Sequence, residues 1–519
     1  MPSLAQVQQI RLDRLRQENT EINWGEFLGV AGREHYRLLA YLSSQFEGRD
    51  IFDIGTHRGA SSLALSYEGS NTIHSFDIEH KYRLAQVPNI QYHLEDLWNP
   101  EVRSRWEARL LGSAFIFLDI DPHEGTRELE FYEWLREKDY KGFVICDDLW
   151  YFKPMRDAFW YKIPAEHRLD ITELGHWSGT GVIRFHASDL WPATQTPTNW
   201  TVVTAYFDLT KMEDASKPIK DRPAQHYLSN ANATMATDQN LVVFCEPETV
   251  ETLRALRPAH LQHKVKFYPM SFEDFPMTKY RAKIQQNRRE KPYHFDERNT
   301  ASYYLFCMAR YAMLKQIIAE NPFQSTHFAW LNVCIERMGW KNLPALDRVW
   351  AAQRDKFSTL YIDYIPKSLV DNEDEFWKWG RCSLCSGFFT GDAVHMKTFC
   401  EAIEEKFLHY LERGRGHADE TLYSPVFFEN RDLFEVYYGD YQEMITNYVE
   451  PRERTFEPVR LLITRSFAAG DYEVCETACD AVWAAYKKGV TDLNSGQLAE
   501  FTAKYRDLRE RLGKGSALP

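Results

Sequence analysis

The feature that most constrains the fold is a strand, a glycine turn and a helix in close succession at residues 51–66, IFDIGTHRGASSLALS. Ile51, Phe52 and Ile54 predict a short buried strand, and Ala60 opens a predicted amphipathic helix. A strand that turns at glycine into a helix N-terminus presents backbone N–H groups and the positive end of the helix dipole to a ligand. The segment therefore predicts a nucleotide or nucleoside site.

The spacing of the glycines narrows the choice of ligand. Gly55 and Gly59 fall as G-x-x-x-G, whereas a loop that carries a pyrophosphate reads G-x-G-x-x-G. A second predicted strand, 72–76, is followed by Asp77, whose carboxylate can accept both ribose hydroxyls of a nucleoside bound across the strand ends. The pattern therefore argues against NAD and for a nucleoside.

Strands and helices alternate through the first part of the chain, which specifies a parallel sheet with helices on both faces. We therefore predict an α/β fold with a Rossmann-like doubly wound sheet for residues 1–190. The predicted strands are 51–54, 72–76, 90–93, 114–118 and 142–146, closed by a hairpin of 169–174 and 181–185; the predicted helices are 4–16, 32–46, 61–67, 100–111 and 127–138.

This order of glycine loop and strand-end acids resembles the class I S-adenosylmethionine-dependent methyltransferases, over roughly residues 29–186. The resemblance implies S-adenosylmethionine as the cofactor. Glu95 and Asp96, after the third strand, would hold the adenine amino group or, alternatively, cap a helix. The cofactor-binding positions implied by the resemblance are Asp53, Gly55, Thr56, Gly59, Ser61, Asp77, Glu95 and Asp96.

Acidic residues also follow the fourth and fifth predicted strands. FIFLDIDPHEG places Asp119 with His123 four residues on, and GFVICDDLW places Asp147 and Asp148. The carboxyl ends of parallel strands lie side by side, and carboxylates gathered there repel one another unless a cation neutralises them. Oxygen ligands with room for water suit Mg²⁺.

The acids are similar in position to those of the metal-dependent O-methyltransferases of the catechol and macrolide-sugar types. The similarity implies Asp119, Asp147 and Asp148 as metal ligands. It also implies Asp119 and His123 as catalytic residues, with His123 as the base. Coordination to Mg²⁺ would stabilise an alkoxide, and His123 would take its proton. Two alternatives stay open: a helix cap at Asp147–Asp148 and a turn at Asp121–Pro122. His176, in GHWSGTG, would reach this site or serve the hairpin alone.

A stretch rich in proline and threonine at 191–199 predicts a linker to a second domain, 200–455. The landmarks TVVTAYFD, LVVFCEPE, FAWLN, CSGFFTGD and HADETLYSPVFF resemble in their order the bacterial HtrL/YibB-like family associated with surface glycans and, more distantly, the GT-A glycosyltransferases. The likeness implies a second α/β domain, GT-A-like. The pattern at 456–519 is helical only and predicts a C-terminal helical cap.

The same resemblance implies a nucleotide-sugar donor. Asn332 stands where the metal-binding acid is expected, so the domain either works without a metal, with Arg310 and Lys315 against the diphosphate, or binds a sugar without transferring it. Asp419 and Glu420 also fit an acid pair at a helix N-terminus. The sugar-nucleotide candidates are Thr204, Asp208, Arg310, Lys315, Asn332, Asp392, Asp419 and Glu420.

Composition limits the class of protein. The net charge of -13 over 519 residues argues against a nucleic-acid partner, which requires a clustered basic face. No apolar run reaches the ~18 residues of a membrane-spanning helix. The nine cysteines are scattered, and Cys382, Cys385, Cys475 and Cys479 form no paired zinc motif. We therefore predict a cytoplasmic protein.

The favoured hypothesis is a bifunctional glycan-modifying enzyme that methylates a sugar hydroxyl with S-adenosylmethionine and Mg²⁺ and transfers a glycosyl group from a nucleotide sugar. Its partner would be a glycan or small-molecule hydroxyl acceptor. One alternative is an O-methyltransferase of a phenol or natural product whose second half serves binding or oligomerisation. Another is a non-enzymatic carbohydrate-recognition scaffold, against which Asp77, the glycines and the acidic residues argue.

Overall fold

The structure is a computed structural model that describes residues 1–18, 20–79, 82–193, 199–291, 296–379, 381–416, 418–450, 456–489 and 493–519. The chain divides into two compact units, Met1–Thr196 and Pro197–Pro519. Each unit has its own seven-stranded sheet. Most of the predicted linker, at 194–198, lies outside the described residues.

The sheet of the first unit has the strand order β3-β2-β1-β4-β5-β7-β6. Strands β1 to β5 are parallel, and β7 runs antiparallel to both β5 and β6. This confirms the predicted doubly wound sheet with a terminal hairpin. The strands are β1 (Asp50–Ile54), β2 (Thr72–Asp77), β3 (Ile90–Leu94), β4 (Phe115–Leu118), β5 (Phe143–Cys146), β6 (Arg168–Asp170) and β7 (Gly181–Arg184).

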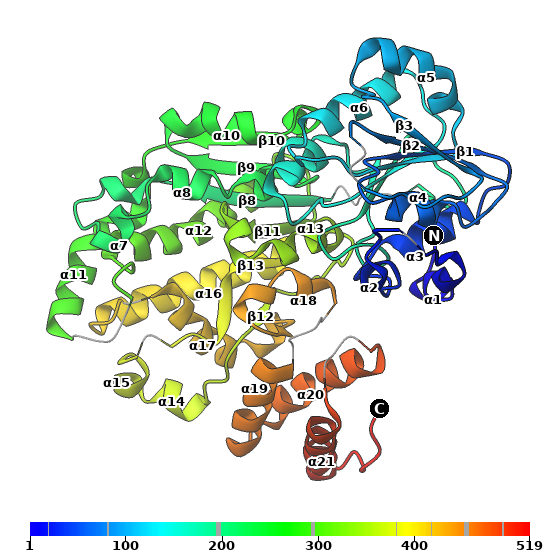
Figure 1. The fold of residues 1–519 in the computed structure, drawn as a ribbon. Helices are drawn as coiled ribbons and strands as arrows, with labels where there is room; N and C mark the ends of the chain where they lie inside the picture. Colours follow the sequence, from blue (N-terminus) through cyan, green and yellow to red (C-terminus); the bar gives the residue numbers. More distant parts are fainter. Residues whose placement is uncertain are drawn as a thin grey trace. The chain divides into compact units, whose positions relative to one another are not determined.

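Helices cover both faces of this sheet. Figure 1 shows α5 and α6 on one face and α3 and α4 on the other. Pro100 and the Asn99 cap, whose side chain accepts the Glu101 N–H, begin α5. The helical elements are α1 (Leu4–Gln8), η1 (Leu12–Leu15), α2 (Trp24–Phe27), α3 (Tyr36–Ser43), α4 (Ala60–Leu65), α5 (Pro100–Gly112), α6 (Thr126–Glu137), η2 (Met155–Phe159) and η3 (Trp160–Lys162).

The predicted single helix at 4–16 is wrong, because α1 ends at Gln8 and a separate short turn follows. The Arg37 guanidinium from α3 donates to the carbonyl oxygens of Gln8, at 3.3 Å, and Ile10. A half-buried arginine thus satisfies carbonyls that a continuous helix would have bonded internally. The sequence pattern cannot show this long-range competitor.

The sheet of the second unit has the order β10-β9-β8-β11-β13-β12-β14. β13 runs antiparallel to β11 and β12, and the other neighbours are parallel. The unit is therefore a second, mixed α/β fold. Its strands are β8 (Trp200–Tyr206), β9 (Asn240–Cys245), β10 (Val265–Pro269), β11 (His327–Leu331), β12 (Ser358–Tyr361), β13 (Leu384–Asp392) and β14 (Tyr437–Tyr438).

Two long helices, α12 and α16, pack together along one face of this sheet, and α10 lies on the other (Figure 1). The helices of this part are α7 (Lys217–Lys220), α8 (Ala224–Leu228), α9 (Asn232–Met235), α10 (Val250–Leu256), α11 (Arg281–Glu290), α12 (Ala301–Glu320), α13 (Leu343–Val349), α14 (Lys367–Asp371), α15 (Glu373–Phe376), α16 (Ala393–Glu412), α17 (Asp419–Glu429) and α18 (Thr446–Val449). Short 3-10 turns are η4 (Leu209–Lys211), η5 (Pro247–Thr249), η6 (Ala259–Lys264), η7 (Phe272–Asp274), η8 (Pro276–Tyr280), η9 (Ile335–Met338), η10 (Trp340–Asn342), η11 (Arg431–Leu433) and η12 (Tyr441–Glu443).

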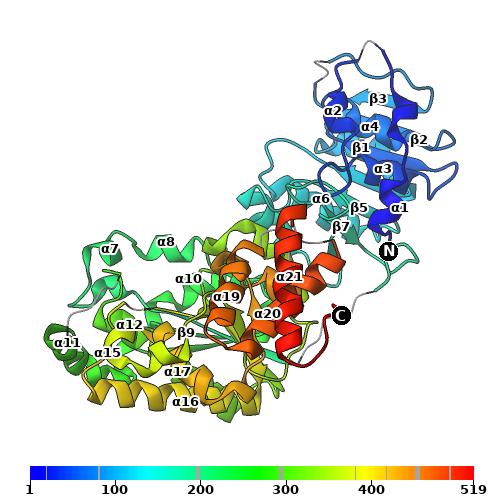
Figure 2. The ribbon, with the colours of Figure 1, turned by 90° about the horizontal axis from the view of Figure 1, so that it is seen from below.

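The C-terminal helices α19 (Phe456–Ala468), α20 (Tyr472–Lys487) and α21 (Ser495–Arg511) lie against one another (Figure 2). Their buried Leu462 and Cys475 join the hydrophobic core of the second sheet. Arg431 donates to Asp471 at 2.6 Å and ties the first turn of α20 to the same unit. The helical cap is therefore part of the second unit.

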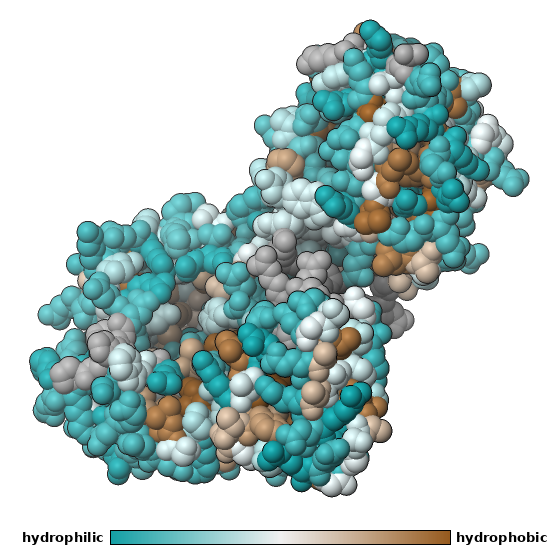
Figure 3. All heavy atoms as spheres, turned by 60° about the horizontal axis from the view of Figure 1, so that its bottom comes forward, coloured by the Kyte–Doolittle hydropathy of each residue, from teal (hydrophilic) through white to brown (hydrophobic). Residues whose placement is uncertain are grey.

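The face in Figure 3 is mainly hydrophilic, with separate hydrophobic patches on each unit. Within the described ranges, no helix combines the length and apolar character needed to cross a membrane.

Candidate active site

A pocket of about 260 Å³ opens at the carboxyl ends of β1 to β4 in the first unit. The order of strand addition reverses between β1 and β4, and ligands of open α/β sheets bind at such a switch point. Six acids contribute to the wall, and Arg127 is the one lysine or arginine among the wall residues that the structure describes. The acids are Asp77, Glu79, Glu95, Asp96, Asp119 and Asp121.

Gly55 and Asp77 form the base of this pocket. Gly55 has φ +105, and a Cβ built on it would lie 1.7 Å from the Asp119 carbonyl oxygen, so only glycine fits. Asp77 accepts the backbone N–H of His57 at 2.8 Å and of Glu79 at 3.2 Å. Each carboxylate oxygen keeps a further lone pair, which leaves acceptors for two ligand hydroxyls.

Three residues predicted to bind the cofactor lie beneath the glycine turn instead of in the wall. Asp53 is fully buried and accepts the hydroxyls of Ser62 at 2.6 Å and Ser75 at 2.7 Å. Burial raises its pKa, against hydrogen bonds from Ser62, Ser75 and Ser61. Thr56 bonds to Ser75 at 2.6 Å. Asp53, Thr56 and Ser61 therefore hold the turn, because the strand alternation points Asp53 under α4.

The other residues predicted to bind the cofactor, Gly59, Glu95 and Asp96, differ in whether they can still contact a ligand. Gly59 has φ +76 and precedes α4. Glu95 is already bonded to the Trp106 indole at 2.9 Å and to Arg105 at 3.1 Å. Asp96 accepts the Trp98 N–H at 2.9 Å and lies in the pocket wall. Asp96 is therefore better placed than Glu95 for a ligand amino group.

A cluster of Asp119, His123 and Asp148 adjoins the pocket, with one ligand atom of each within 4.8 Å of the others. His123 Nε2 lies 3.2 Å from an Asp121 oxygen and 3.3 Å from an Asp148 oxygen. The Phe152 ring stacks on His123 at 4.5 Å. Carboxylates thus orient the imidazole toward the cluster.

The carboxylates of this cluster are not balanced by a lysine or arginine in the interactions of the described residues. Burial, then the charges of Asp147 and Asp148, raise the pKa of Asp119 well above its usual range. Burial and Asp147 raise the pKa of Asp148. Both shifts are the response of acids held together out of water.

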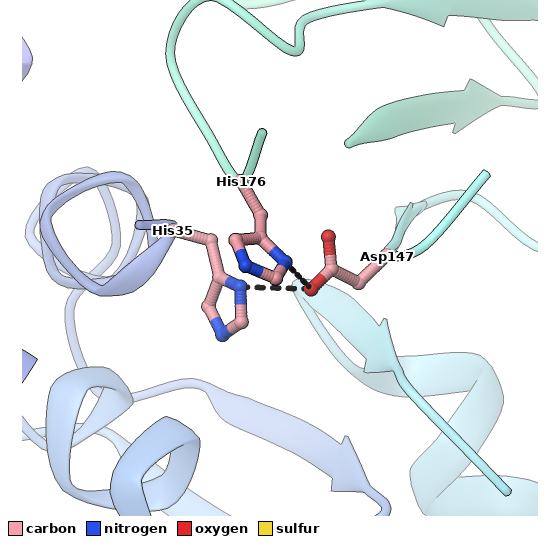
Figure 4. A group of neighbouring side chains, drawn as sticks. All are labelled: His35, Asp147 and His176. Carbon is pink, nitrogen blue, oxygen red and sulfur yellow. Dashed lines mark hydrogen bonds and ion pairs between the residues drawn. The ribbon is translucent and has the colours of Figure 1, made fainter. Parts of the chain in front are cut away.

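Asp147 has its closest polar partners in a second group of side chains, so the three predicted metal ligands are divided between two neighbouring groups. Its Oδ2 lies 2.9 Å from His35 Nδ1 and 3.0 Å from His176 Nδ1. Figure 4 shows both imidazole rings directed at this carboxylate. Both residues follow the end of β5, and Asp148 has left-handed backbone at φ 60, so the two neighbouring side chains contribute to different groups. His176 was a candidate from the sequence, whereas His35 carries no signal there.

Of the six non-glycine residues with positive φ in the described ranges, three lie in the pocket wall or in the Asp119 cluster. His57, His123 and Asp148 have φ of 45, 55 and 60, in the left-handed region that non-glycine residues seldom adopt. Such conformations cost about 1–3 kcal/mol each and gather at functional sites. Their presence here agrees with a site whose geometry is fixed by the fold.

In the second unit, Arg310, Asn332, Asp419 and Glu420 of the predicted set come together near the end of β11. Arg310 donates to the Ser386 carbonyl at 2.7 Å and pairs with Asp419 at 3.6 Å. Glu420 accepts the N–H and hydroxyl of Ser386 at 3.0 and 2.9 Å. Burial and Asp419 raise the pKa of Glu420 to about 7.

The Arg310 cluster retains unused polar capacity. Among the described residues, neither Arg310 Nε nor Asp419 Oδ2 has a hydrogen-bond partner, although both are buried. The Asn332 side chain accepts the Trp330 indole N–H at 2.9 Å. The cluster therefore has one buried cation against two acids.

The other four predicted sugar-nucleotide residues do not join the Arg310 cluster. Thr204 is buried within β8. Asp208 caps η4, and Lys315 pairs with Glu404 on α16. Asp392 caps α16, and its register partner His327 begins β11, at the opposite end of that strand from Asn332. Asp208, Lys315 and Asp392 have local structural partners, because capping and ion pairing use the same side chains as ligand binding.

Residues 198–449 match the family described as "Bacterial protein of unknown function (HtrL_YibB)", as the sequence resemblance predicted. A similar solved structure is the apo form of mouse xyloside xylosyltransferase 1, with 11% sequence identity over 46% of this chain and 84% of that chain and a TM-score of 0.25. A likeness at that score carries no argument about activity. The comparison with curated proteins gives no match.

Proposed function

We propose that the first unit transfers the methyl group of S-adenosylmethionine to a sugar hydroxyl with the help of a divalent cation. The observation that carries this proposal is the acidic wall of the switch-point pocket, with six carboxylates and Arg127. Such a wall repels a diphosphate and suits a ligand with a cationic sulfonium and a ribose. Asp77 would accept the ribose hydroxyls and Asp96 the adenine amino group.

The uncompensated carboxylates of Asp119 and Asp148 fit a hard cation such as Mg²⁺. When bound, this cation stabilises the alkoxide form of an acceptor hydroxyl. Asp119 and Asp148 would hold the cation, and the neutral imidazole of His123, beside Asp121 and Asp148, would take the hydroxyl proton. The pocket then fixes the methyl carbon in line with that oxygen, which supplies most of the remaining acceleration.

Exposed aromatic side chains favour a sugar as acceptor. Tyr151 is 52% and Trp177 45% exposed, and their rings meet at 5.3 Å beside His176 and Asp148 on the chain. The C–H faces of a sugar ring pack on such surfaces while its hydroxyls stay hydrated. The runner-up acceptor is a phenol or another natural-product hydroxyl, which an acceptor panel separates from a glycan.

Methyl transfer from labelled S-adenosylmethionine to a panel of sugars and phenols tests the proposal. We expect Mg²⁺-dependent transfer that Asp119→Asn and Asp148→Asn each reduce by at least about 100-fold. His123→Gln should lower kcat while Mg²⁺ binding persists, which separates a base from a ligand. Asp139→Asn, an exposed aspartate paired with Lys141, is the matched control. Full activity in a chelator would remove the cation from the account.

We propose glycosyl transfer from a nucleotide sugar as the function of the second unit. The specific observation in its favour is the convergence near the end of β11 of the buried Arg310 and Asp419 with the half-buried Asn332 and Glu420. Because Asn332 stands where a metal-binding acid is expected, the diphosphate would be bound by Arg310 and not through a metal. Titration of UDP- and GDP-sugars should give binding that Glu420→Gln weakens; no binding across the panel would leave a non-catalytic domain.

We also propose that both reactions take place in the cytoplasm. All nine cysteines are unpaired, as expected in a reducing compartment. A mobility shift on non-reducing gels of protein taken directly from cells would contradict this location.

A further inference from the structure

We propose that His35, Asp147 and His176 bind a divalent transition metal of the Zn²⁺ class, at a second site separate from the oxygen-ligated one. Two imidazole nitrogens and one carboxylate oxygen make a borderline-soft donor set. Three protein ligands leave at least one coordination position for water or another ligand. Mg²⁺ prefers oxygen donors and would not compete well here.

The spacing of the donor atoms fits one ion. Asp147 Oδ2 lies 2.9 Å from His35 Nδ1 and 3.0 Å from His176 Nδ1. Zinc bonds of about 2.0–2.1 Å at tetrahedral or right angles separate neighbouring ligand atoms by about 2.9–3.4 Å. All three donor atoms lie within 4.8 Å of one another. His35 directly precedes α3, Asp147 directly follows β5, and His176 lies in the β6–β7 loop (Figure 4).

The orientation of His35 points to a ligand. The side chain is 7% exposed, and its Nδ1 meets no partner in hydrogen-bond geometry among the described residues, despite the 2.9 Å to Asp147. A hydrogen bond directs the N–H at the acceptor. Atoms that share a metal instead direct their lone pairs at a common point beside the line that joins them, which this arrangement matches.

Neighbouring side chains position the ligand atoms of Asp147 and His176, as the groups around the ligands do in metal sites. Thr180 donates to Asp147 Oδ1 at 3.0 Å, which leaves Oδ2 for the ion. A Glu34 oxygen lies 3.9 Å from His176 Nε2, on the far side of that ring from Nδ1. Ser178 Oγ is 2.7 Å from His176 Nδ1 and adds an oxygen at the site.

The competing explanation is a hydrogen-bonded His–Asp–His triad that orders the loop without an ion. Only the first explanation predicts that the protein binds a transition metal. Neither explanation depends on whether the first unit transfers methyl groups. Metal-free full-length protein is therefore titrated with Co²⁺ and Zn²⁺ in excess Mg²⁺, which occupies the oxygen site. We expect one Co²⁺ per chain with visible ligand-field absorption, displaced by Zn²⁺.

Variants assign the ion to its ligands. His35→Gln and His176→Gln should each weaken Zn²⁺ binding by at least about 100-fold. His186→Gln, an exposed histidine paired with Asp139, is the matched control. His35→Cys should restore part of the affinity, because a thiolate also binds Zn²⁺.

The proposal is overturned if wild-type protein takes up no Co²⁺ or Zn²⁺, or if His35→Gln binds as wild type does. Should the variants fail to fold, anomalous scattering at the zinc edge from wild-type crystals decides. A peak between His35 and His176 supports the site, and its absence after zinc soaking overturns it.

Discussion

The two sheets begin alike and end in opposite electrostatic arrangements. In each, the first strand lies inside, two strands are added on one side, and the fourth strand is placed on the other side of the first. At the first sheet, Asp119 and Asp148 have no lysine or arginine partner among the residues that the structure describes; at the second, Asp419 faces Arg310. One topology therefore carries an excess of carboxylates in one unit and, in the other, a cluster that contains a buried arginine.

Glycine replacement should give the largest contrast between the units. Gly55→Ala places a Cβ 1.7 Å from the Asp119 carbonyl at φ +105, which neither atom can relieve. We expect a loss of more than about 4 kcal/mol in the first unit. Gly387→Ala in β13 meets mainly the flexible Met444 side chain at 3.1 Å and is the control. Hydrogen exchange of the backbone amides measures the stability of each unit in each variant. If the first unit of Gly55→Ala were as protected as the second unit of Gly387→Ala, the predicted difference between the units would be contradicted.

Removing the buried cation of the second unit should come next in size. Arg310→Met leaves Asp419 buried without its partner and the Ser386 carbonyl without its donor. We expect about 3–5 kcal/mol of destabilisation, part of which Arg310→Met/Asp419→Asn should recover. Thermal unfolding checks this, and an unchanged melting profile would show that the pair is not structural.

Glu420 should make the second unit less stable as the pH rises. Its pKa of about 7 in the folded state lies above the ordinary 4.5, so between these values the folded state holds more protons than the unfolded state. Stability is then greatest below about pH 4.5 and falls until about pH 7, by at most about 3 kcal/mol. Glu420→Gln keeps an acceptor for Ser386 and should flatten the profile; a parallel decline in wild type and variant would refute the assignment.

Neutralising an acid in the first unit should have the smallest effect and the opposite sign. Asp148→Asn relieves repulsion with Asp147 and Asp119, and asparagine tolerates φ 60. In the absence of cations we expect a gain of about 1 kcal/mol, together with weaker stabilisation by Mg²⁺. Melting with and without Mg²⁺ measures both quantities, and destabilisation in chelator would mean that Asp148 is a structural residue.

Local patterns predicted the fold better than they predicted the site. Gly55 and Asp77 were found because a glycine turn and a strand-end acid are set by short-range geometry. Asp147 and Asp148 were placed in one cluster because the sequence shows their adjacency but not which face each side chain takes. His35 was missed because its contact with Asp147 spans the unit and leaves no periodic signal.

In the second unit, too, local sequence patterns predict strands better than they predict which side chains can bind a ligand. The landmarks TVVTAYFD and LVVFCEPE fall on β8 and β9, since buried β-branched runs are a strong signal. No landmark marks β10, because half-buried edge strands lack that signal. Lys315 and Asp392 looked available and proved to be engaged by Glu404 and the start of α16.

The central claim is that the acidic pocket of the first unit binds S-adenosylmethionine. Isothermal titration of S-adenosylmethionine into the full chain tests it most directly, with Asp77→Ala and the distant Asp139→Asn beside the wild type. The account predicts one molecule bound per chain, unchanged affinity in Asp139→Asn and at least about tenfold weaker binding in Asp77→Ala. Wild-type protein that binds no S-adenosylmethionine, with or without Mg²⁺, would contradict it.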